Sequence, residues 1–452
     1  MAEQRAHWGS KLGFVLAAAG SAVGLGNIWK FPYITGVNGG GAFVFIYLIC
    51  IVLVGLPVMI AEILLGRATQ KSTVSAYRAL SSPRSLWVSF GWLGVAGSFL
   101  LLSYYSVVAG WALNYTWLSI TGSLVERGPD GMAPLFDSVQ RSGSLNLVTH
   151  FVFMTLTVLV VVGGVGQGLE RWSRILMPAL FVMMLILLVR GFSLAGFGQA
   201  AEFVFGAHTD RLTAGGVLEA LGHAFFTLSL GMGSIITYGS YLRRDDDIMG
   251  AAITISVVDT VIALMAAMVL FPIIFTFGMQ PSQGPGLVFV TMPIAMAQLP
   301  AGGFLAAIFF LLLVFAALTS SISMLEVTAS YFIDEKGWSR ERATLISGGA
   351  VALVGIPSAL AGGDGFFGAG MTQLVGSNWF SVADYLVSNW VLPLGGLGIS
   401  LFMAWRVDDA IRHDHFLSGS KLAFFYKAWV VLLKYFVPFA IALVLLHAIG
   451  VV

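Results

Sequence analysis

Two glycine-interrupted stretches decide the fold: AGSAVGLGN at residues 19–27 and TLSLGMGS at residues 227–234. Each lies inside an apolar segment and pairs a Gly-x-Gly with a residue whose oxygen can bind a cation, Asn27 or Thr227. Paired glycines weaken a helix, so both positions predict local unwinding. For one isolated pair, glycines that merely permit close helix crossing are the simpler interpretation. Two pairs at equivalent places in two halves of the chain favour unwinding.

The rest of the chain has the composition of a membrane protein. Of its 452 residues, 58% are hydrophobic and 10% are charged, and the mean hydropathy is +0.90. Soluble proteins are about a quarter charged, which excludes a water-soluble domain and a disordered chain. A net charge of +1 leaves no basic surface for nucleic acid. One cysteine, Cys50, excludes a disulfide framework.

The hydropathy pattern predicts an all-α polytopic membrane protein, because a spanning helix needs roughly 20 apolar residues. Eleven such segments lie at 11–36, 41–66, 86–122, 146–165, 172–193, 214–241, 247–277, 302–333, 342–361, 379–405 and 423–448. The polar segments 123–145, 194–213 and 278–301 are expected to be loops with short surface helices. We expect one transporter domain over 1–452.

Charged residues in the loops predict the orientation. With the N-terminus in the cytoplasm, 17 of the 23 Lys and Arg residues lie inside and four lie outside, as the positive-inside rule requires. Eleven spans then place the C-terminus outside. We expect no cleavable signal peptide, because the first apolar segment is long and contains Asn27, Lys30 and Pro32.

Interrupted helices are a known design for transport. Unwound backbone in lipid must have its polar groups satisfied. Half-helix N-termini favour a carboxylate, and freed carbonyl groups favour a hard cation such as Na⁺. Transporters built from two inverted repeats use pairs of such helices at the bilayer midplane. The two stretches occupy equivalent places if residues 11–193 and 214–405 are two five-helix repeats, with 423–448 outside them.

Several sequence blocks resemble the neurotransmitter:sodium symporter family over nearly the whole chain. They are WGSKLGF at 8–14, AVGLGNIWKFP at 22–32, NGGGAF at 38–43, FFTLSLG at 225–231, and Pro57 with Glu62 and Gly66-Arg67. The similarity is greatest to bacterial eleven-span hydrophobic amino acid transporters of the leucine transporter type. It implies the 5+5 inverted-repeat leucine-transporter fold, with the first and sixth helices broken mid-membrane, in a bacterial inner membrane. Glu62 matches a buried family acid that we interpret as structural.

The resemblance implies two Na⁺ sites. The first takes the Ala22 carbonyl, the Asn27 amide oxygen, Thr227 and Asp259, completed by the substrate carboxylate. Asp259 lies in an otherwise apolar run, where an acid is costly and a functional candidate. A carboxylate satisfied only by its neighbours is the alternative.

The second Na⁺ site implied by the resemblance takes the carbonyls of Gly20, Val23 and Ala316 with the hydroxyls of Thr319 and Ser320. Hydroxyls that bond only to their own helix are the alternative.

Chloride is not expected as a cofactor. The positions that match the family's chloride site are Tyr47, His223, Thr227, Asp259 and Ala263. Asp259 would repel chloride, and Ala263 has no hydroxyl to bind it. The negative charge of Asp259 must be balanced when the empty transporter returns, and proton antiport is one hypothesis for this step.

The substrate site implied by the resemblance is small and mostly apolar, so the expected cargo is a neutral hydrophobic amino acid. Its residues are Ala22, Leu25, Gly26, Leu101, Tyr105, Phe226, Thr227, Ser229, Met232, Ser320 and Met324. Met232 stands where the leucine transporter has an aromatic residue. Because Met adapts its shape, cargo as large as Trp, Tyr or Phe is expected beside Leu, Ile, Val and Met. A Met in the ordinary core is the alternative.

Gates are also implied by the resemblance. Lys30 and Asp384 match the outer pair, with Lys in place of the usual Arg and therefore no bidentate fork; Tyr105 and Phe226 form the lid. The residues that match the inner gate are Arg5, Trp8, Asp334 and Tyr241. Each charge could instead be a solvated loop end. Gly168 and Pro178 match a motif for local unwinding, with a simple proline kink as the alternative.

Other classes of function would need other sequence features. A channel would need an ion-lined pore rather than paired gates. A membrane enzyme would need a motif such as Gly-x-Ser-x-Gly or His-Glu-x-x-His, which the sequence lacks. An amino-acid sensor on the same fold, or a cation-coupled transporter of another small zwitterion, stays open. Membrane lipid is the expected surrounding, and no obligate protein partner is evident.

Overall fold

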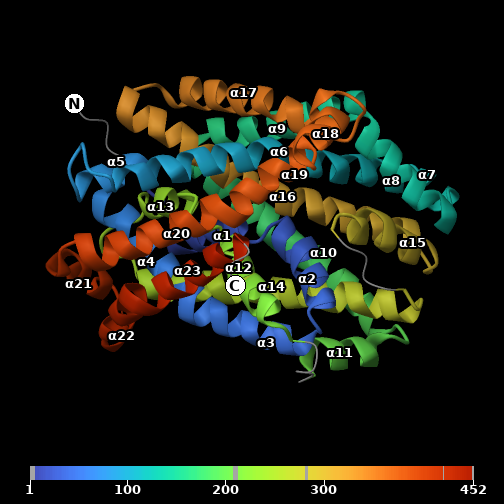
Figure 1. Ribbon diagram of the computed structural model, residues 1–452, viewed down its shortest axis with the longest axis horizontal. Helices are drawn as coiled ribbons and strands as arrows, with labels where there is room; N and C mark the ends of the chain where they lie inside the picture. The colour runs from blue at the N-terminus through green and yellow to red at the C-terminus, as the bar shows by residue number, and fades with distance from the viewer. Residues whose placement is uncertain (1–5, 207–211, 280–283, 421, 450–452) are drawn as a thin grey trace.

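The computed structural model describes residues 6–206, 212–279, 284–420 and 422–449. Across these ranges the chain is helical, with no β-strand (Figure 1). The helices of the first half are α1 (Lys11–Ala22), α2 (Phe31–Val37), α3 (Gly41–Cys50), α4 (Leu56–Thr69), α5 (Thr73–Ala79), α6 (Val88–Ile120), α7 (Ser123–Glu126), α8 (Met132–Arg141), α9 (Gly143–Val162), α10 (Arg171–Phe192) and α11 (Phe197–Phe205).

The second half continues the helical pattern. Its helices are α12 (Ala214–Thr227), α13 (Ser234–Gly239), α14 (Ile248–Thr276), α15 (Met292–Ala297), α16 (Gly302–Lys336), α17 (Arg340–Ala359), α18 (Met371–Val375), α19 (Trp379–Leu386), α20 (Leu392–Leu401), α21 (Asp409–Leu417), α22 (Tyr426–Val431) and α23 (Val437–Ala448). Wider π-helical turns join many of them: η1 (Gly26–Lys30), η2 (Ile51–Gly55), η4 (Gly164–Glu170), η6 (Leu287–Thr291), η7 (Phe366–Gly370), η8 (Val387–Val391), η9 (Phe402–Arg406) and η11 (Leu432–Phe436). Short 3₁₀ turns are η3 (Pro129–Gly131) and η10 (Ala423–Phe425).

Side-chain caps fix where several long helices begin. The Ser10 hydroxyl accepts from Gly13 N at 2.9 Å at the start of α1. The Asp247 carboxylate accepts from Gly250 N at 3.0 Å at the start of α14. Such caps satisfy backbone donors that a helix leaves unpaired in its first turn.

The described ranges contain nine helices long and apolar enough to cross a membrane, or ten if the bent pair Lys11–Ala22 and Gly26–Val37 is one span. The protein is therefore a multi-pass membrane protein. The expected number was eleven. The segment predicted at 214–241 is divided here into α12, of 14 residues, and α13, of six. Neither helix alone is as long as a span.

The predicted loops contain short helices. Segment 123–145 holds α7 and α8, segment 194–213 holds α11, and segment 278–301 holds α15. The helix α15 is largely buried, so this part of the polar segment covers the bundle rather than projecting from it.

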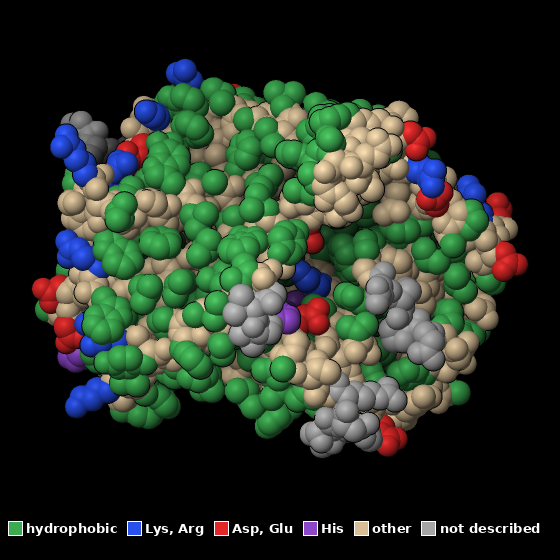
Figure 2. Space-filling model, viewed as in Figure 1, with side chains coloured by type: hydrophobic (Ala, Val, Ile, Leu, Met, Phe, Trp, Pro, Cys, Tyr) green, Lys and Arg blue, Asp and Glu red, His purple; other side chains and the backbone are tan. Residues whose placement is uncertain are grey.

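The long helix α16 runs through the centre of the bundle (Figure 1). It packs on α6, α9, α10 and α17, and α1 lies against α14, α10 and α16. A helix that is apolar all round belongs in the interior, and the residues of α16 between Leu312 and Tyr331 are buried almost throughout. Lys and Arg side chains gather at one end of the molecule, beside α5, α21 and α22 (Figures 1 and 2).

Gly66 lies where α4 and α13 pack closely, and this contact yields a testable prediction. A Cβ there would stand 2.0 Å from the Ile236 carbonyl oxygen of α13, whereas a Cβ on Gly349 in α17 meets nothing within 4 Å. Gly66→Ala is expected to destabilise the fold by about 1–3 kcal/mol through overpacking. Gly349→Ala removes a flexible helical glycine and should stabilise by up to about 1 kcal/mol. Thermal unfolding of both variants in detergent checks this, and equal melting temperatures would contradict it.

Candidate substrate and cation sites

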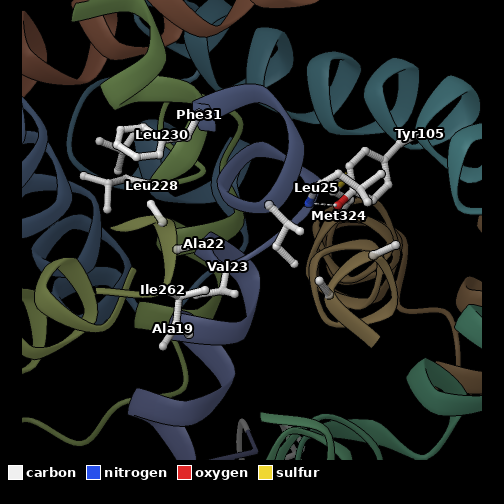
Figure 3. Packing of buried hydrophobic residues seen from close by; sticks show 14 of the residues in the cluster. Ala19, Ala22, Val23, Leu25, Phe31, Tyr105, Leu228, Leu230, Ile262 and Met324 are labelled. Carbon is white, nitrogen blue, oxygen red and sulfur yellow. Dashed lines mark hydrogen bonds between the residues drawn. The ribbon is translucent and has the colours of Figure 1, made fainter. Parts of the chain in front are cut away.

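The first interruption lies between α1 and η1. The chain is extended at Val23, where φ is −69° and ψ is 103°, and helical structure resumes at Gly26 after a 50° bend. The freed Leu25 N–H donates to the Tyr105 hydroxyl at 3.1 Å (Figure 3). A Cβ on Gly24 would stand 2.6 Å from Ser320 Oγ. Glycine therefore lets this backbone approach α6 and α16.

The second interruption covers residues 228–233, between α12 and α13. Ser229, Gly231 and Gly233 have φ values of 55°, 81° and 80°, the left-handed region in which glycine is not strained. Gly231 N donates to Glu62 Oε1 at 2.7 Å. The Ser229 hydroxyl donates to the Ser21 carbonyl at 2.7 Å. The two interruptions are therefore bonded to each other.

The side chains predicted for the first Na⁺ site lie together. The Asn27 amide nitrogen donates to Thr227 Oγ1 at 2.9 Å and to Asp259 Oδ1 at 2.7 Å. The Thr227 hydroxyl lies 3.2 and 3.1 Å from the two Asp259 carboxylate oxygens. All three side chains are buried, from η1, α12 and α14, and Ala22 ends the adjacent α1. The Asn27 amide N–H and the Thr227 hydroxyl thus surround one buried carboxylate, while Asn27 Oδ1, the predicted ligand atom, accepts from Gly24 N at 3.0 Å.

The groups predicted for the second Na⁺ site also lie together, between α1 and α16. The Thr319 hydroxyl contacts the Val23 carbonyl at 3.5 Å and the Ala316 carbonyl at 3.0 Å. The Ser320 hydroxyl contacts the Gly20 carbonyl at 3.5 Å and the Val23 carbonyl at 3.4 Å. Five oxygens from segments about 300 residues apart thus share one small region, the kind of ligand set that hard cations prefer.

The positions that match a chloride site are packed with rings. His223 is stacked between Phe31 and Phe226, with ring centroids 5.9 and 6.4 Å away, and Tyr47 lies 5.6 Å from it. Neither ring nitrogen of His223 has a hydrogen-bond partner among the described residues. Ala263 is buried and offers no donor. Among these five positions Asp259 carries the carboxylate, and chloride independence stays a prediction.

Ten of the eleven predicted substrate residues line one small cavity between α1, α6, α12 and α16. Leu25 is the exception, and contributes its N–H to the Tyr105 hydroxyl instead. The cavity measures about 20 Å³, roughly the space for one water molecule. An amino acid can enter only if the walls move apart. In Figure 3, the side chains of Tyr105 and Met324 lie beside Leu25.

A larger cavity of about 350 Å³ lies on the other side of Tyr105 and Phe226, which line both spaces. Lys30 and Asp384 line it as well, yet these two described residues form no ion pair. Lys30 Nζ lies 4.3 Å from the centre of the Phe226 ring. Asp384 Oδ1 accepts from the hydroxyls of Tyr104 and Ser388, both at 3.1 Å. The two residues predicted for the outer gate thus have different partners, and their role as a gate stays a prediction.

The opposite side is closed by Trp8. Its indole N–H donates to the Tyr238 carbonyl at 3.0 Å, and its backbone N–H donates to the Tyr241 carbonyl at 3.2 Å. Asp334 Oδ2 accepts from Ser72 N at 2.5 Å. Arg5, the remaining predicted member of this gate, lies outside the described residues.

Three further residues on this side are not among those predicted from the sequence. Tyr241 donates to Glu326 Oε1 at 2.5 Å, and Arg340 holds both oxygens of Glu326 at 2.7 and 2.9 Å. Glu170 accepts from Gly9 N at 2.7 Å and connects the segment before α1 to the end of η4. Glu326 is an acid in an apolar run, the same signal that singled out Asp259.

Gly168 and Pro178 lie at the start of the fifth predicted span. Gly168 belongs to the π-helical turn η4, and Pro178 is inside α10. A Cβ on Gly168 would stand 2.2 Å from the Val160 carbonyl oxygen. The segment is wound as a wide helix here, and the prediction that it unwinds stays a prediction.

Apolar spans that enclose oxygen clusters beside a small cavity are typical of a membrane transporter. The sequence matches the Sodium:neurotransmitter symporter family over residues 5–127 and 130–449. The chain belongs to this family of sodium-coupled symporters, which are transporters rather than enzymes.

Similar proteins include the sodium-dependent transporter YhdH of Bacillus subtilis, 40% identical over 100% of this chain and 99% of that protein. A sodium-dependent transporter of Haemophilus influenzae is 31% identical over 98% of each chain. The crystal structure of MhsT in complex with L-phenylalanine is similar with a TM-score of 0.89. It shares 40% identity and covers 98% of this chain and 100% of that one. The leucine-transporter type of fold expected from the sequence is therefore confirmed.

The buried pair at the closed side yields a prediction. Glu326→Gln leaves the Arg340 guanidinium without its carboxylate and should cost roughly 3–5 kcal/mol of stability. Glu326→Gln combined with Arg340→Gln removes both charges and should cost less than the single change. Thermal unfolding measures the order of the two variants. Asp137→Asn breaks an exposed pair with Arg141 at 3.0 Å and serves as the control without measurable effect. A double variant less stable than Glu326→Gln would contradict the prediction.

Proposed function

We propose that the protein imports neutral hydrophobic and aromatic L-amino acids by alternating access, driven by two Na⁺ ions. The observation that carries this proposal is the meeting of two buried oxygen clusters beside one small apolar cavity. The crystal structure of the similar MhsT in complex with L-phenylalanine supports an amino acid as cargo. The Leu25 N–H and the Tyr105 hydroxyl, 3.1 Å apart, are suited to hold its carboxylate.

The proposed architecture has eleven transmembrane helices in two inverted five-helix repeats. Residues 11–193 form the first repeat, 214–405 the second, and 423–448 a helix outside them. The 50° bend after Ala22 and the separation of α12 from α13 support breaks in the first and sixth helices. The concentration of Lys and Arg at one end supports a cytoplasmic N-terminus and an outward C-terminus in a bacterial inner membrane (Figure 2).

Coupling follows from a shared ligand. The substrate carboxylate completes the first cation site beside Asn27, Thr227 and Asp259, so ion and cargo stabilise each other's binding. Two positive charges that move down about 100 mV gain about 4.6 kcal/mol. This drives more than a thousandfold accumulation. We further propose that Asp259 makes transport independent of chloride and that proton antiport balances its charge on return.

Proteoliposome uptake tests the proposed function. Labelled Leu and Trp are expected to accumulate with an inward Na⁺ gradient, to compete with each other, and to accumulate equally when gluconate replaces chloride. Internal acid is expected to accelerate Na⁺-driven uptake if a proton leaves in exchange. Uptake driven by H⁺ alone would overturn the two-sodium mechanism. Measurable binding without accumulation under any gradient would favour a sensor.

The variant Asp259→Asn tests the ion site in the same assay. It keeps the shape of the side chain but removes the carboxylate, so the Na⁺ concentration for half-maximal uptake is expected to rise about tenfold or more. Ser256→Ala is the matched control on the same face of α14, where the hydroxyl contacts only Met59 Sδ at 3.7 Å. Equal Na⁺ dependence of both variants would contradict the assignment.

Met232 is proposed to set the range of cargo size. Its flexible side chain lines the 20 Å³ cavity and can yield to an aromatic substrate. Met232→Phe should therefore lower uptake of Trp relative to Leu by about tenfold, the size of discrimination that a few pocket atoms provide. The measurement is the ratio of the two uptake rates at saturating Na⁺. Met279→Phe, a change of the same type outside this cavity, should leave the ratio unchanged.

A further inference from the structure

A third cavity, of about 440 Å³, lies at the Lys- and Arg-rich end, away from the substrate and cation clusters. Five basic residues line it, from the segment before α1, the end of α4, the connection between α13 and α14, and α21. They are His7, Arg67, Arg243, Arg244 and His415. No carboxylate is among the described residues that line this cavity.

Three of the aspartates nearby accept hydrogen bonds. Asp246 Oδ2 accepts from Arg243 N at 2.8 Å, and Asp414 Oδ2 accepts from the Arg244 guanidinium at 2.9 Å. Asp247 caps α14. The Arg243 side chain is exposed and forms no ion pair with any described residue. The residues that line the cavity are therefore basic or neutral, and the aspartates Asp245, Asp246, Asp247 and Asp414 lie next to them in the chain or in space.

Two buried nitrogen atoms in the wall of this cavity have no hydrogen-bond partner among the described residues. Arg67 is 2% exposed; its terminal nitrogens donate to the carbonyls of Asp246 and His415, but its Nε has no partner among the described residues. The same is true of His415 Nδ1. Burial and, next, the positive charge of Arg67 lower the pKa of His415. Both nitrogen atoms are enclosed by protein, so the exposed Arg243 and Arg244 side chains are the groups that an anion in the cavity meets first.

We propose that this cavity binds a phosphate group, carried by an anionic lipid headgroup or by free inorganic phosphate. Arginine is suited to phosphate because its planar fork donates several hydrogen bonds. The cavity lies at one end of the bundle, at the last turn of the span Gly41–Thr69, where a headgroup or a dissolved anion can reach it.

Occupancy would act on the adjacent gate. His7 precedes Trp8 in the chain and Leu242, another lining residue, follows Tyr241. An anion bound between the segments that carry these residues holds them together and favours the closed state of that side. A ligand that prefers one of two states shifts the equilibrium toward it.

The test uses the purified full-length protein in detergent and two probes. A fluorescent short-chain phosphatidylglycerol is titrated by polarisation, with zwitterionic phosphatidylcholine for comparison, and sodium phosphate competes against sodium gluconate at equal ionic strength. Phosphatidylglycerol is expected to bind and phosphatidylcholine to bind weakly. Displacement by millimolar phosphate identifies a site open to the free anion, and resistance to it identifies a lipid headgroup site.

Matched variants decide whether the cavity is responsible. Arg243→Gln with Arg244→Gln should weaken binding about tenfold or more, whereas Lys71→Gln with Arg84→Gln removes equal charge from exposed positions outside the cavity and should not. Ala68→Trp fills the cavity and keeps every charge, so it should weaken binding equally. The proposal is overturned if neither probe binds, if both charge variants behave alike, or if Ala68→Trp has no effect while melting temperatures are unchanged.

Discussion

The structure depends on how two interrupted helices satisfy their backbone in a setting without water. Unwound peptide groups in lipid are costly unless protein groups replace the missing helical bonds. Here Tyr105 accepts from the Leu25 N–H and Glu62 accepts from the Gly231 N–H. Ser98 Oγ donates to the Met232 carbonyl at 2.7 Å. Each partner comes from a continuous helix, α4 or α6, so the long helices form a scaffold that holds the irregular segments in place.

This requirement explains why the polar residues gather in the centre of an apolar bundle. The carbonyls that α1 releases at Gly20 and Val23 point to the hydroxyls of α16 at 3.5 Å or less. The same release at α12 leaves Thr227 beside Asp259. Unwinding thus causes the energetic cost of unpaired backbone groups and also provides the proposed binding sites. The groups that lose helical partners are the ones that can hold a cation.

Much of this arrangement could be predicted because local chemistry marks it. The glycine pairs near Gly24 and Gly231 and the acid at Asp259 stand out in apolar sequence, and the family resemblance joins positions that no spacing connects. The ion pair of Glu326 with Arg340 could not be predicted from spacing alone, since the loop after α16 decides whether Arg340 turns back. The volume of the 20 Å³ cavity depends on side-chain packing. The absence of an ion pair between the described residues Lys30 and Asp384 depends on the contact of Lys30 with the Phe226 ring.

The two ends of the molecule are held by different kinds of contact, which bears on the transport cycle. The closed side combines the Trp8 bonds with a buried ion pair and its tyrosine, and all must break together before it opens. The outer side has a cation–π contact and hydrogen bonds to Asp384 from Tyr104 and Ser388, which are weaker and partly exposed to water. Ions and cargo can shift this equilibrium only toward a state that binds them more tightly. That state has either the inner contacts broken or the outer residues closer together. The proposed contact of the substrate carboxylate with Leu25 and Tyr105 would meet that condition, because closure of the proposed lid over it would remove competing water from both donors.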